Sequence, residues 1–226
     1  MRNPSFVGRM IIGLLVALSA AAALPLGAAA GKPPGNTVTL SAVPNPIRFG
    51  NATTLSGKVT GPDHSGVAVT LRADPFPVNA ATVVATTTTD TNGDFSFAGI
   101  KPDRHTRYSV RAKTSPPAES AAVDVLVRVR VTLRLGDSTP HVGQRVRFFG
   151  SATPQHDGSV VRIQRRRATG SWKTVGQTLL RDAGDVRSRY SRRVRIRRDG
   201  TYRARVIAVD GDHLSGNSRR RRVDAH

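Results

Sequence analysis

Hydrophobic and polar residues alternate with a period of two along most of the chain after residue 36. Leu71 lies between Thr70 and Arg72, and Val146 lies between Arg145 and Arg147. Successive side chains of a strand point to opposite faces, so this pattern places one residue in two against a core. Clusters of Gly, Asn and Asp, such as residues 91–94, separate the alternating segments. The pattern predicts about seven short strands per 90–100 residues and an all-β fold of β-sandwiches.

The positions predicted to face a core fall into two sets. They are Thr53, Leu55, Val59, Val67, Val69, Leu71, Phe95, Phe97, Tyr108, Val110 and Ala112 in the first, and Val146, Phe148, Val161, Ile163, Val194, Ile196, Tyr202, Ala204 and Val206 in the second.

A repeat with an offset of 93 residues divides the chain into two copies of one module. The repeated positions are Val38-Thr39-Leu40, Gly50 and Gly57 in the first copy, and Val131-Thr132-Leu133, Gly143 and Gly150 in the second. Residues 121–135 hold no glycine or proline, so the last strand of the first module is expected to continue into the second. The repeat predicts one sandwich over residues 37–126, a second over 127–223, and a frayed C-terminus over 224–226.

The first 30 residues have the layout of a secretory signal peptide. Arg2 and Arg9 precede an uncharged, largely apolar run that continues to Lys32, and Ala28 and Ala30 are small residues suited to a cleavage site. We therefore expect a signal peptide over residues 1–30, a disordered segment over 31–36, and a secreted or cell-surface protein. The alternative is an uncleaved N-terminal anchor, since the uncharged run is long enough to span a bilayer.

Positive charge is concentrated in the second module. The chain carries a formal net charge of +20. Residues 32–125 hold 9 lysines and arginines against 7 acidic residues, whereas residues 126–226 hold 24 against 8. A strongly basic module favours anionic partners, such as cell-wall polymers, lipid headgroups or nucleic acid.

Arginines alternate with core residues along the predicted strands of the second module, so they are expected on the outer faces of both sheets. Guanidinium groups bind phosphate and carboxylate through two parallel hydrogen bonds. The predicted anion-binding residues are Arg128, Arg130, Arg145, Arg147, Arg193, Arg195, Arg197, Arg203 and Arg205. The alternative is a solvated surface without a ligand, because 30 of the 35 cationic residues are arginine and a GC-rich genome produces that bias by codon usage.

Catalytic and metal-binding motifs are not found in the sequence. None of the six histidines is spaced from another as metal ligands on one strand or helix are, and we expect them to be solvated loop residues. They are His64, His105, His141, His156, His213 and His226. Cysteine is absent, which excludes disulfides and thiolate chemistry. The sequence therefore predicts a protein that is not an enzyme and has no metal or cofactor.

Two acidic loops and one aromatic residue allow a second interpretation. Asp90, Asn92 and Asp94 could bind calcium, and so could Asp210 and Asp212 with nearby Asn217, but neither loop completes a calcium-binding pattern and turn formation is preferred. Trp172, the only tryptophan, could stack on a sugar or a base, but a packing role on a middle strand is preferred.

The second module resembles the bacterial immunoglobulin-like repeat modules of secreted surface proteins. The resemblance rests on Gly143-x-x-Val146-x-Phe148-x-Gly150, Val161-x-Ile163, Trp172-x-x-Val175 and Asp199-Gly200-Thr201-Tyr202. Its Asp-x-x-Tyr segment looks like a tyrosine corner, in which the phenol binds nearby backbone. The first module, with Asp90-x-Asn92-Gly93-Asp94-Phe95-x-Phe97, is similar to carboxypeptidase regulatory-like sandwich domains. The resemblance implies two tandem immunoglobulin-like β-sandwiches that serve as spacer, adhesion or accessory domains, without catalytic residues.

These observations together predict a non-enzymatic cell-envelope protein. It would act as a spacer or binding module whose basic second domain holds anionic envelope polymers. Two alternatives are sequence-nonspecific binding of extracellular nucleic acid, and an accessory or inhibitory role beside a secreted enzyme.

Overall fold

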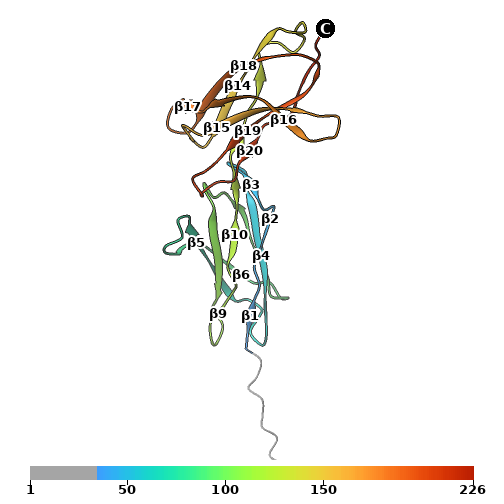
Figure 1. The fold of residues 1–226 in the computed structure, drawn as a ribbon. Helices are drawn as coiled ribbons and strands as arrows, with labels where there is room; N and C mark the ends of the chain where they lie inside the picture. The colour runs from blue at the N-terminus through green and yellow to red at the C-terminus, as the bar shows by residue number, and fades with distance from the viewer. Residues whose placement is uncertain (1–34) are drawn as a thin grey trace, which may run out of the picture. The chain divides into compact units, whose positions relative to one another are not determined.

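The computed structural model describes residues 35–226, which Figure 1 shows as two groups of strands that follow one another along the chain. The predicted signal peptide and residues 31–34 of the predicted disordered segment lie outside the described residues. Every regular element of the described residues is a strand, so the predicted all-β fold is confirmed. A helix of the length and hydrophobicity needed to cross a membrane is not found among them.

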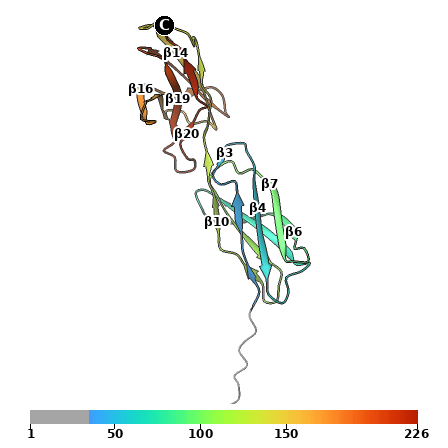
Figure 2. The same cartoon turned by 90° about the vertical axis from the view of Figure 1, so that its right-hand side faces the viewer.

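The first sandwich consists of two antiparallel sheets. One sheet has the order β1-β4-β2, with β7 also pairing with β4 (Figure 2); the other has the order β10-β8-β5-β6, with β9 also pairing with β8. The strands are β1 (Thr37–Val38), β2 (Ser41–Val43), β3 (Ile47–Arg48), β4 (Thr53–Thr60), β5 (Ala68–Pro75), β6 (Thr82–Thr88), β7 (Asp94–Ile100), β8 (Thr106–Ala112), β9 (Ala118–Glu119) and β10 (Val123–Val125).

The second sandwich repeats this construction. One sheet has the order β12-β14-β18-β17 with β13 on β14, and the other has the order β16-β15-β19-β20 with β21 on β19. Strand β11 (Val127–Arg128) lies between the two sandwiches in the chain, and the strands of the second are β12 (Arg130–Val131), β13 (Arg134–Leu135), β14 (Arg145–Thr153), β15 (Val160–Arg166), β16 (Trp172–Leu179), β17 (Arg181–Asp182), β18 (Ser188–Arg195), β19 (Gly200–Ile207), β20 (Gly216–Asn217) and β21 (Arg221–Val223). Strand β11 precedes it and pairs in parallel with β3 of the first sandwich.

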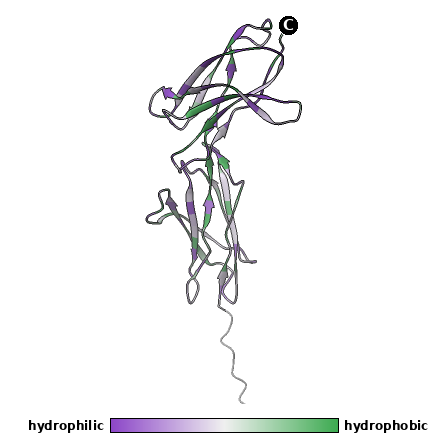
Figure 3. Cartoon of the chain, in the orientation of Figure 1, coloured by the Kyte–Doolittle hydropathy of each residue, from purple (hydrophilic) through white to green (hydrophobic). Residues whose placement is uncertain are grey.

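Each sandwich encloses its own hydrophobic core between its two sheets. All the positions that alternation assigned to a core are buried, so that prediction is confirmed residue by residue. The core of the first sandwich includes Val127, and that of the second begins with Val129. Apolar and polar segments follow one another along the strands of both sandwiches (Figure 3). The chain thus passes from one core to the next within three residues.

The 93-residue repeat marks one close backbone approach that occurs in both sandwiches. In the second sandwich the Thr132 amide donates to the Ser151 carbonyl oxygen at 2.9 Å, and the Ser151 amide donates to the Thr132 hydroxyl at 2.9 Å. A Cβ atom on Gly150 would collide with the Thr132 carbonyl oxygen, and one on Gly57 would collide with that of Thr39. Only glycine leaves room for this pairing, which explains why threonine and glycine recur together.

The tyrosine corner predicted in the second sandwich is present in the structure. The buried Tyr202 hydroxyl donates to the Arg198 carbonyl oxygen, four residues upstream, at 3.4 Å. This is the contact by which a tyrosine corner fixes the start of its strand, here β19.

Candidate anion-binding surface

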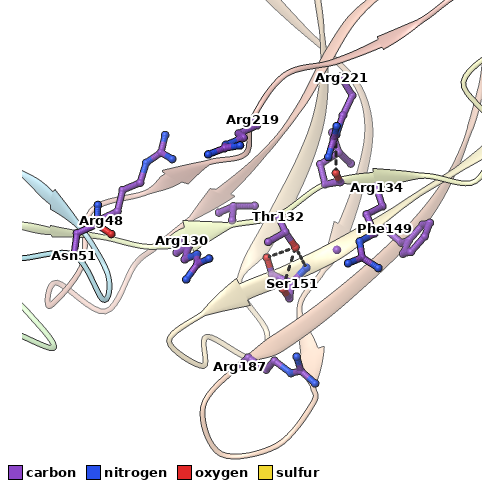
Figure 4. Close-up of a pocket in the computed structure, with 13 residues that line it drawn as sticks. Arg48, Asn51, Arg130, Thr132, Arg134, Phe149, Ser151, Arg187, Arg219 and Arg221 are labelled. Carbon is purple, nitrogen blue, oxygen red and sulfur yellow. Dashed lines mark hydrogen bonds between the residues drawn. The ribbon is translucent and has the colours of Figure 1, made fainter.

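A groove lined by six arginines lies beside β12 and β13 of the second sandwich (Figure 4). Its volume is about 860 Å³. The arginines come from five separate segments: β3, β12, β13, the loop before β18, and the C-terminal segment that leads into β21. They are Arg48, Arg130, Arg134, Arg187, Arg219 and Arg221. Aspartate and glutamate are absent from the lining residues, so the groove presents positive charge alone.

The floor of the groove is the repeated threonine pairing. The Thr132 hydroxyl lies 3.0 Å from the Ser151 hydroxyl, and the arginine side chains surround this pair (Figure 4). The half-buried Phe149 adds one aromatic face. Arg221 is held in place, because its Nε donates to the Leu133 carbonyl oxygen at 3.2 Å. The site therefore combines a fixed polar floor with long cationic side chains above it.

Carboxylates do not neutralise these groove arginines within residues 35–226. In the second sandwich the one arginine paired with carboxylates among the described residues is Arg222, which contacts Asp199 at 3.7 Å and Asp224 at 2.6 Å. In the first sandwich, by contrast, Arg107 binds Asp124 at 2.8 Å. The guanidinium groups of the groove thus remain available for an external anion.

Four of the predicted anion-binding residues form a row beside the groove, on β14 and β18. Arg145 lies opposite Arg195, and Arg147 opposite Arg193, in the antiparallel register. All four are exposed. Like charges directly across a ladder are unfavourable, so an anion that bridges them would stabilise this face.

The row and the groove meet at Phe149. The guanidinium carbon of Arg147 lies 4.8 Å from the centre of the Phe149 ring, which also lines the groove. Two of the row arginines are oriented by hydrogen bonds: Arg147 Nε donates to the Ser191 hydroxyl at 2.9 Å, and Arg195 Nε donates to the Gly143 carbonyl oxygen at 3.0 Å. Row and groove therefore form one basic surface, which we call the arginine surface.

The remaining predicted arginines differ in exposure and in the sheet on which they lie. Arg130 lines the groove and Arg197 is exposed beyond the end of β18. Arg128 is half-buried, and its Nη1 donates to the Ser215 carbonyl oxygen at 2.8 Å. Arg203 and Arg205 lie on β19, in the other sheet. These three residues lie outside the core but are half-buried, so they are less exposed than the four row arginines.

Arg203 and Arg205 are half-buried because neighbouring side chains cover them. Arg203 Nε donates to the Gln164 side-chain oxygen at 2.9 Å, and its guanidinium carbon lies 4.0 Å from the Trp172 ring centre. Burial lowers the pKa of Arg203, and the charges of Arg205 and Arg220 lower it further. The Nε of Arg205 is buried without a hydrogen-bond partner among the described residues. Both residues are therefore less accessible to an external anion than the exposed arginines of the arginine surface.

The expectation that Trp172 packs on a middle strand is wrong. Trp172 begins β16, which is the edge strand of its sheet and pairs only with β15 among the described strands. The side chain is half-buried and lies outside the hydrophobic core. Its ring lies against Arg203, where a cation over the aromatic face replaces core packing.

Sequence reasoning missed five of the six groove arginines, namely Arg48, Arg134, Arg187, Arg219 and Arg221. Two signals were available. Arg134 alternates with Leu133 and Leu135, and Arg221 belongs to a run of four arginines over residues 219–222. Arg48 carries no such signal, because only the tertiary structure brings it beside the second sandwich.

Of the two acidic loops, the first forms a turn as expected. Asp90 Oδ1 accepts from the amides of Asn92 at 2.8 Å and Asp94 at 2.9 Å. These backbone hydrogen bonds lower the pKa of Asp90. The carboxylate is thus used to close a turn on its own backbone.

The second acidic loop forms a cluster with two histidines, which the sequence did not predict. Asp210 and Asp212 lie beside His156 and His213, and the four ligand atoms are all within 4.8 Å of one another. The side chains of His156 and His213 are only 2% and 5% exposed, so the expectation of solvated loop histidines is wrong for these two.

Comparison with known proteins gives little guidance. No protein-family model matches the chain, and no curated protein sequence matches it. Among solved structures, the ectodomain of the teleost fish polymeric immunoglobulin receptor is similar to this chain. The match covers 83% of this chain and 97% of the receptor chain. The identity is 10% and the TM-score 0.32, a likeness too low to carry an argument.

Proposed function

We propose that the protein is a non-enzymatic binding module whose arginine surface holds an anionic polymer of the cell envelope, with phosphate or carboxylate groups as the points of attachment. The observation that carries the proposal is a groove with six arginines and no acidic lining residue. Surface charge that only serves solubility is normally of mixed sign, with acids among the bases.

The chemistry of the groove suits phosphate and carboxylate. Guanidinium groups form paired hydrogen bonds with both anions, and the groove arginines reach in from several segments. The hydroxyls of Thr132 and Ser151 lie at the floor, where they can donate to further oxygens. Several anions spaced along a chain would satisfy this arrangement better than a single ion.

The arginine row extends the surface beyond the groove. Its cross-strand pairs, Arg145 with Arg195 and Arg147 with Arg193, are mutually repulsive until counterions or a ligand screen them. A polymer that leaves the groove past Phe149 meets this row next. A repeating anion therefore fits the surface as a whole.

Nucleic acid has the same phosphate chemistry and is the main competitor. Proteins that bind single strands combine a basic groove along the backbone with several aromatic side chains on which the bases stack. Phe149 is the one aromatic residue among the groove residues. The surface thus favours an anionic polymer recognised by charge over one recognised by its bases.

The test compares binding of an anionic wall polymer and of single-stranded DNA, each titrated at the same series of salt concentrations. We expect the wall polymer to bind more tightly, with affinity that falls as salt rises. The Arg130→Gln/Arg219→Gln double variant should weaken that affinity about tenfold, because two charge-assisted contacts are lost.

The matched control removes two charges elsewhere in the same sandwich. Arg166 and Arg167 are exposed, lie at the turn between β15 and β16, and do not line the groove. Arg166→Gln/Arg167→Gln should change the affinity by less than about threefold, as expected for charges that act only at long range. Equal losses in both variants, or tighter binding of DNA, would contradict the proposal.

A further inference from the structure

His156, Asp210, Asp212 and His213 form a cluster apart from the arginine surface. His156 lies in the loop between β14 and β15, and the other three lie in the loop between β19 and β20. Both histidines are buried, whereas the side chains of Asp210 and Asp212 are 38% and 22% exposed. The cluster therefore has a buried nitrogen side and a carboxylate side open to solvent.

The outer nitrogen of each imidazole is fixed by a backbone carbonyl. His156 Nδ1 lies 2.9 Å from the Pro154 carbonyl oxygen, and His213 Nε2 lies 2.7 Å from that of Asp103. A carbonyl oxygen can only accept, so both nitrogens carry the proton. The tautomer is thereby decided, and the other nitrogen of each ring faces the cluster. Histidines that bind metals are commonly oriented by such a contact.

The inward nitrogens face carboxylate oxygens at short distance. His156 Nε2 lies 2.7 Å from Asp210 Oδ2, and His213 Nδ1 lies 2.7 Å from Asp212 Oδ1. A neutral imidazole presents a lone pair there, and a lone pair repels a carboxylate oxygen. Each contact thus requires a cation, which is either a proton, on the ring or on the carboxyl group, or a metal ion shared by the two groups.

His156 Nε2 distinguishes these possibilities. The atom is buried, and its contact with Asp210 lacks the geometry of a hydrogen bond, so it has no hydrogen-bond partner among the described residues. A proton on this nitrogen would point at no acceptor, which is costly inside a protein. Without that proton the nitrogen has a lone pair, which a metal ion bound beside the Asp210 carboxylate can accept.

We propose that these four residues bind a divalent transition metal ion, with zinc as the best match. Two imidazole nitrogens and two carboxylate oxygens form a four-ligand set of the kind zinc accepts, at about 2.0–2.2 Å from the ion. Such a tetrahedral set has ligand atoms roughly 3.3 Å apart. The four atoms already lie within 4.8 Å of one another, so only small side-chain movements are needed.

Calcium fits the same cluster poorly. It prefers six to eight oxygen ligands, and half of the ligand atoms here are imidazole nitrogens. Imidazole nitrogen is a ligand of zinc, copper, iron and nickel. The ion would join the β14–β15 loop to the β19–β20 loop. Its ligand His213 also contacts the first sandwich, through the hydrogen bond of Nε2 to the Asp103 carbonyl oxygen.

The test is a titration of the metal-free full chain with zinc, followed by calorimetry and thermal unfolding, and with cobalt, followed by visible absorption. We expect one saturable zinc ion per chain, a higher unfolding temperature, and the absorption bands of tetrahedral cobalt. His156→Gln and Asp210→Asn should each weaken zinc binding by about 100-fold, since each removes a ligand.

A second histidine pair supplies the matched control. The rings of His141 and His226 are exposed, with centroids 4.4 Å apart. His141→Gln should leave zinc affinity and the cobalt spectrum unchanged. Circular dichroism of each metal-free variant establishes that it is folded.

Two outcomes would overturn the proposal. The first is an absence of saturable binding in the folded wild-type chain, which would mean that the cluster is held by protonated imidazoles alone. The second is zinc binding that His141→Gln abolishes and His156→Gln leaves intact.

Discussion

The hydroxyl of Tyr190 donates a hydrogen bond of 2.6 Å to the carbonyl oxygen of Thr132, at the floor of the arginine groove. Tyr190 is buried, and burial raises the pKa of its phenol well above the usual range. The same carbonyl lies against Gly150. This contact thus ties the core of the second sandwich to the backbone that carries Arg130 and Arg134.

Removal of this hydroxyl tests the contact. Tyr190→Phe should lower the free energy of unfolding by about 1–2 kcal/mol, because the Thr132 carbonyl oxygen loses its phenol donor. Urea unfolding followed by circular dichroism measures the loss. Tyr202→Phe is the comparison, since its hydrogen bond is longer, at 3.4 Å, and its loss should cost less. A larger loss of stability in Tyr202→Phe than in Tyr190→Phe would contradict the assigned strength of the Tyr190 hydrogen bond.

A side chain at the repeated glycine should be tolerated poorly in either sandwich. Gly150→Ala and Gly57→Ala place a Cβ against a backbone carbonyl that cannot move without breaking the paired strands. Each should lower the free energy of unfolding by more than about 2 kcal/mol. Gly136→Ala serves as the control, because a Cβ there makes only an ordinary contact with Arg147. A loss at Gly136 equal to that at Gly150 would show that backbone crowding is not the cause.

Stability should fall below about pH 6.5 because of His105. Its Nδ1 accepts a hydrogen bond of 2.9 Å from the Val127 amide, so that nitrogen must be unprotonated in the folded chain. Burial lowers the pKa of His105 from 6.5, and His213 lowers it further, against the opposing charges of Asp212, Asp210 and Asp124. Since the unfolded chain then binds more protons, folding stability is complete above the unfolded pKa and is lost as pH falls toward the folded pKa.

The measurement is urea unfolding from pH 7.5 to pH 5 for the wild type and for His105→Asn, both with a chelator present. Asparagine can retain an acceptor near the Val127 amide but does not titrate. The wild-type curve should therefore decline more steeply than that of the variant over the acidic part of the range. Parallel curves would show that groups other than His105 account for the pH dependence.

The contact between Arg203 and Trp172 should be visible in fluorescence. Trp172 is the only tryptophan, so the emission of the chain reports on this site alone. Arg203→Ala removes the guanidinium 4.0 Å from the ring centre and should shift the emission maximum to longer wavelength, because water replaces it. Arg220→Ala, whose guanidinium carbon is 5.8 Å away, should have a smaller effect.

Much of the fold follows from local pattern. Alternation assigned residues such as Leu71 and Phe148 to the cores correctly, because successive side chains of a strand must point to opposite faces. The offset of 93 residues marked a backbone approach that only glycine allows, and this constraint acts within a single pair of strands. Both the alternation and the repeated glycine depend only on the sheet face or the adjacent strand, which any β-sandwich provides.

What the sequence by itself determined, then, is which side of each strand meets a core and where the chain repeats its module. The tertiary structure alone decided strand order, and with it the position of Trp172 on an edge strand. It also decided which distant residues meet: Arg48 with Arg219 in the groove, and His156 with His213 in the buried cluster. The physical reason is that alternation fixes only the face on which a side chain lies. Convergence of side chains depends on how sheets and loops close around a core, and the periodicity of one segment carries no information about its partners.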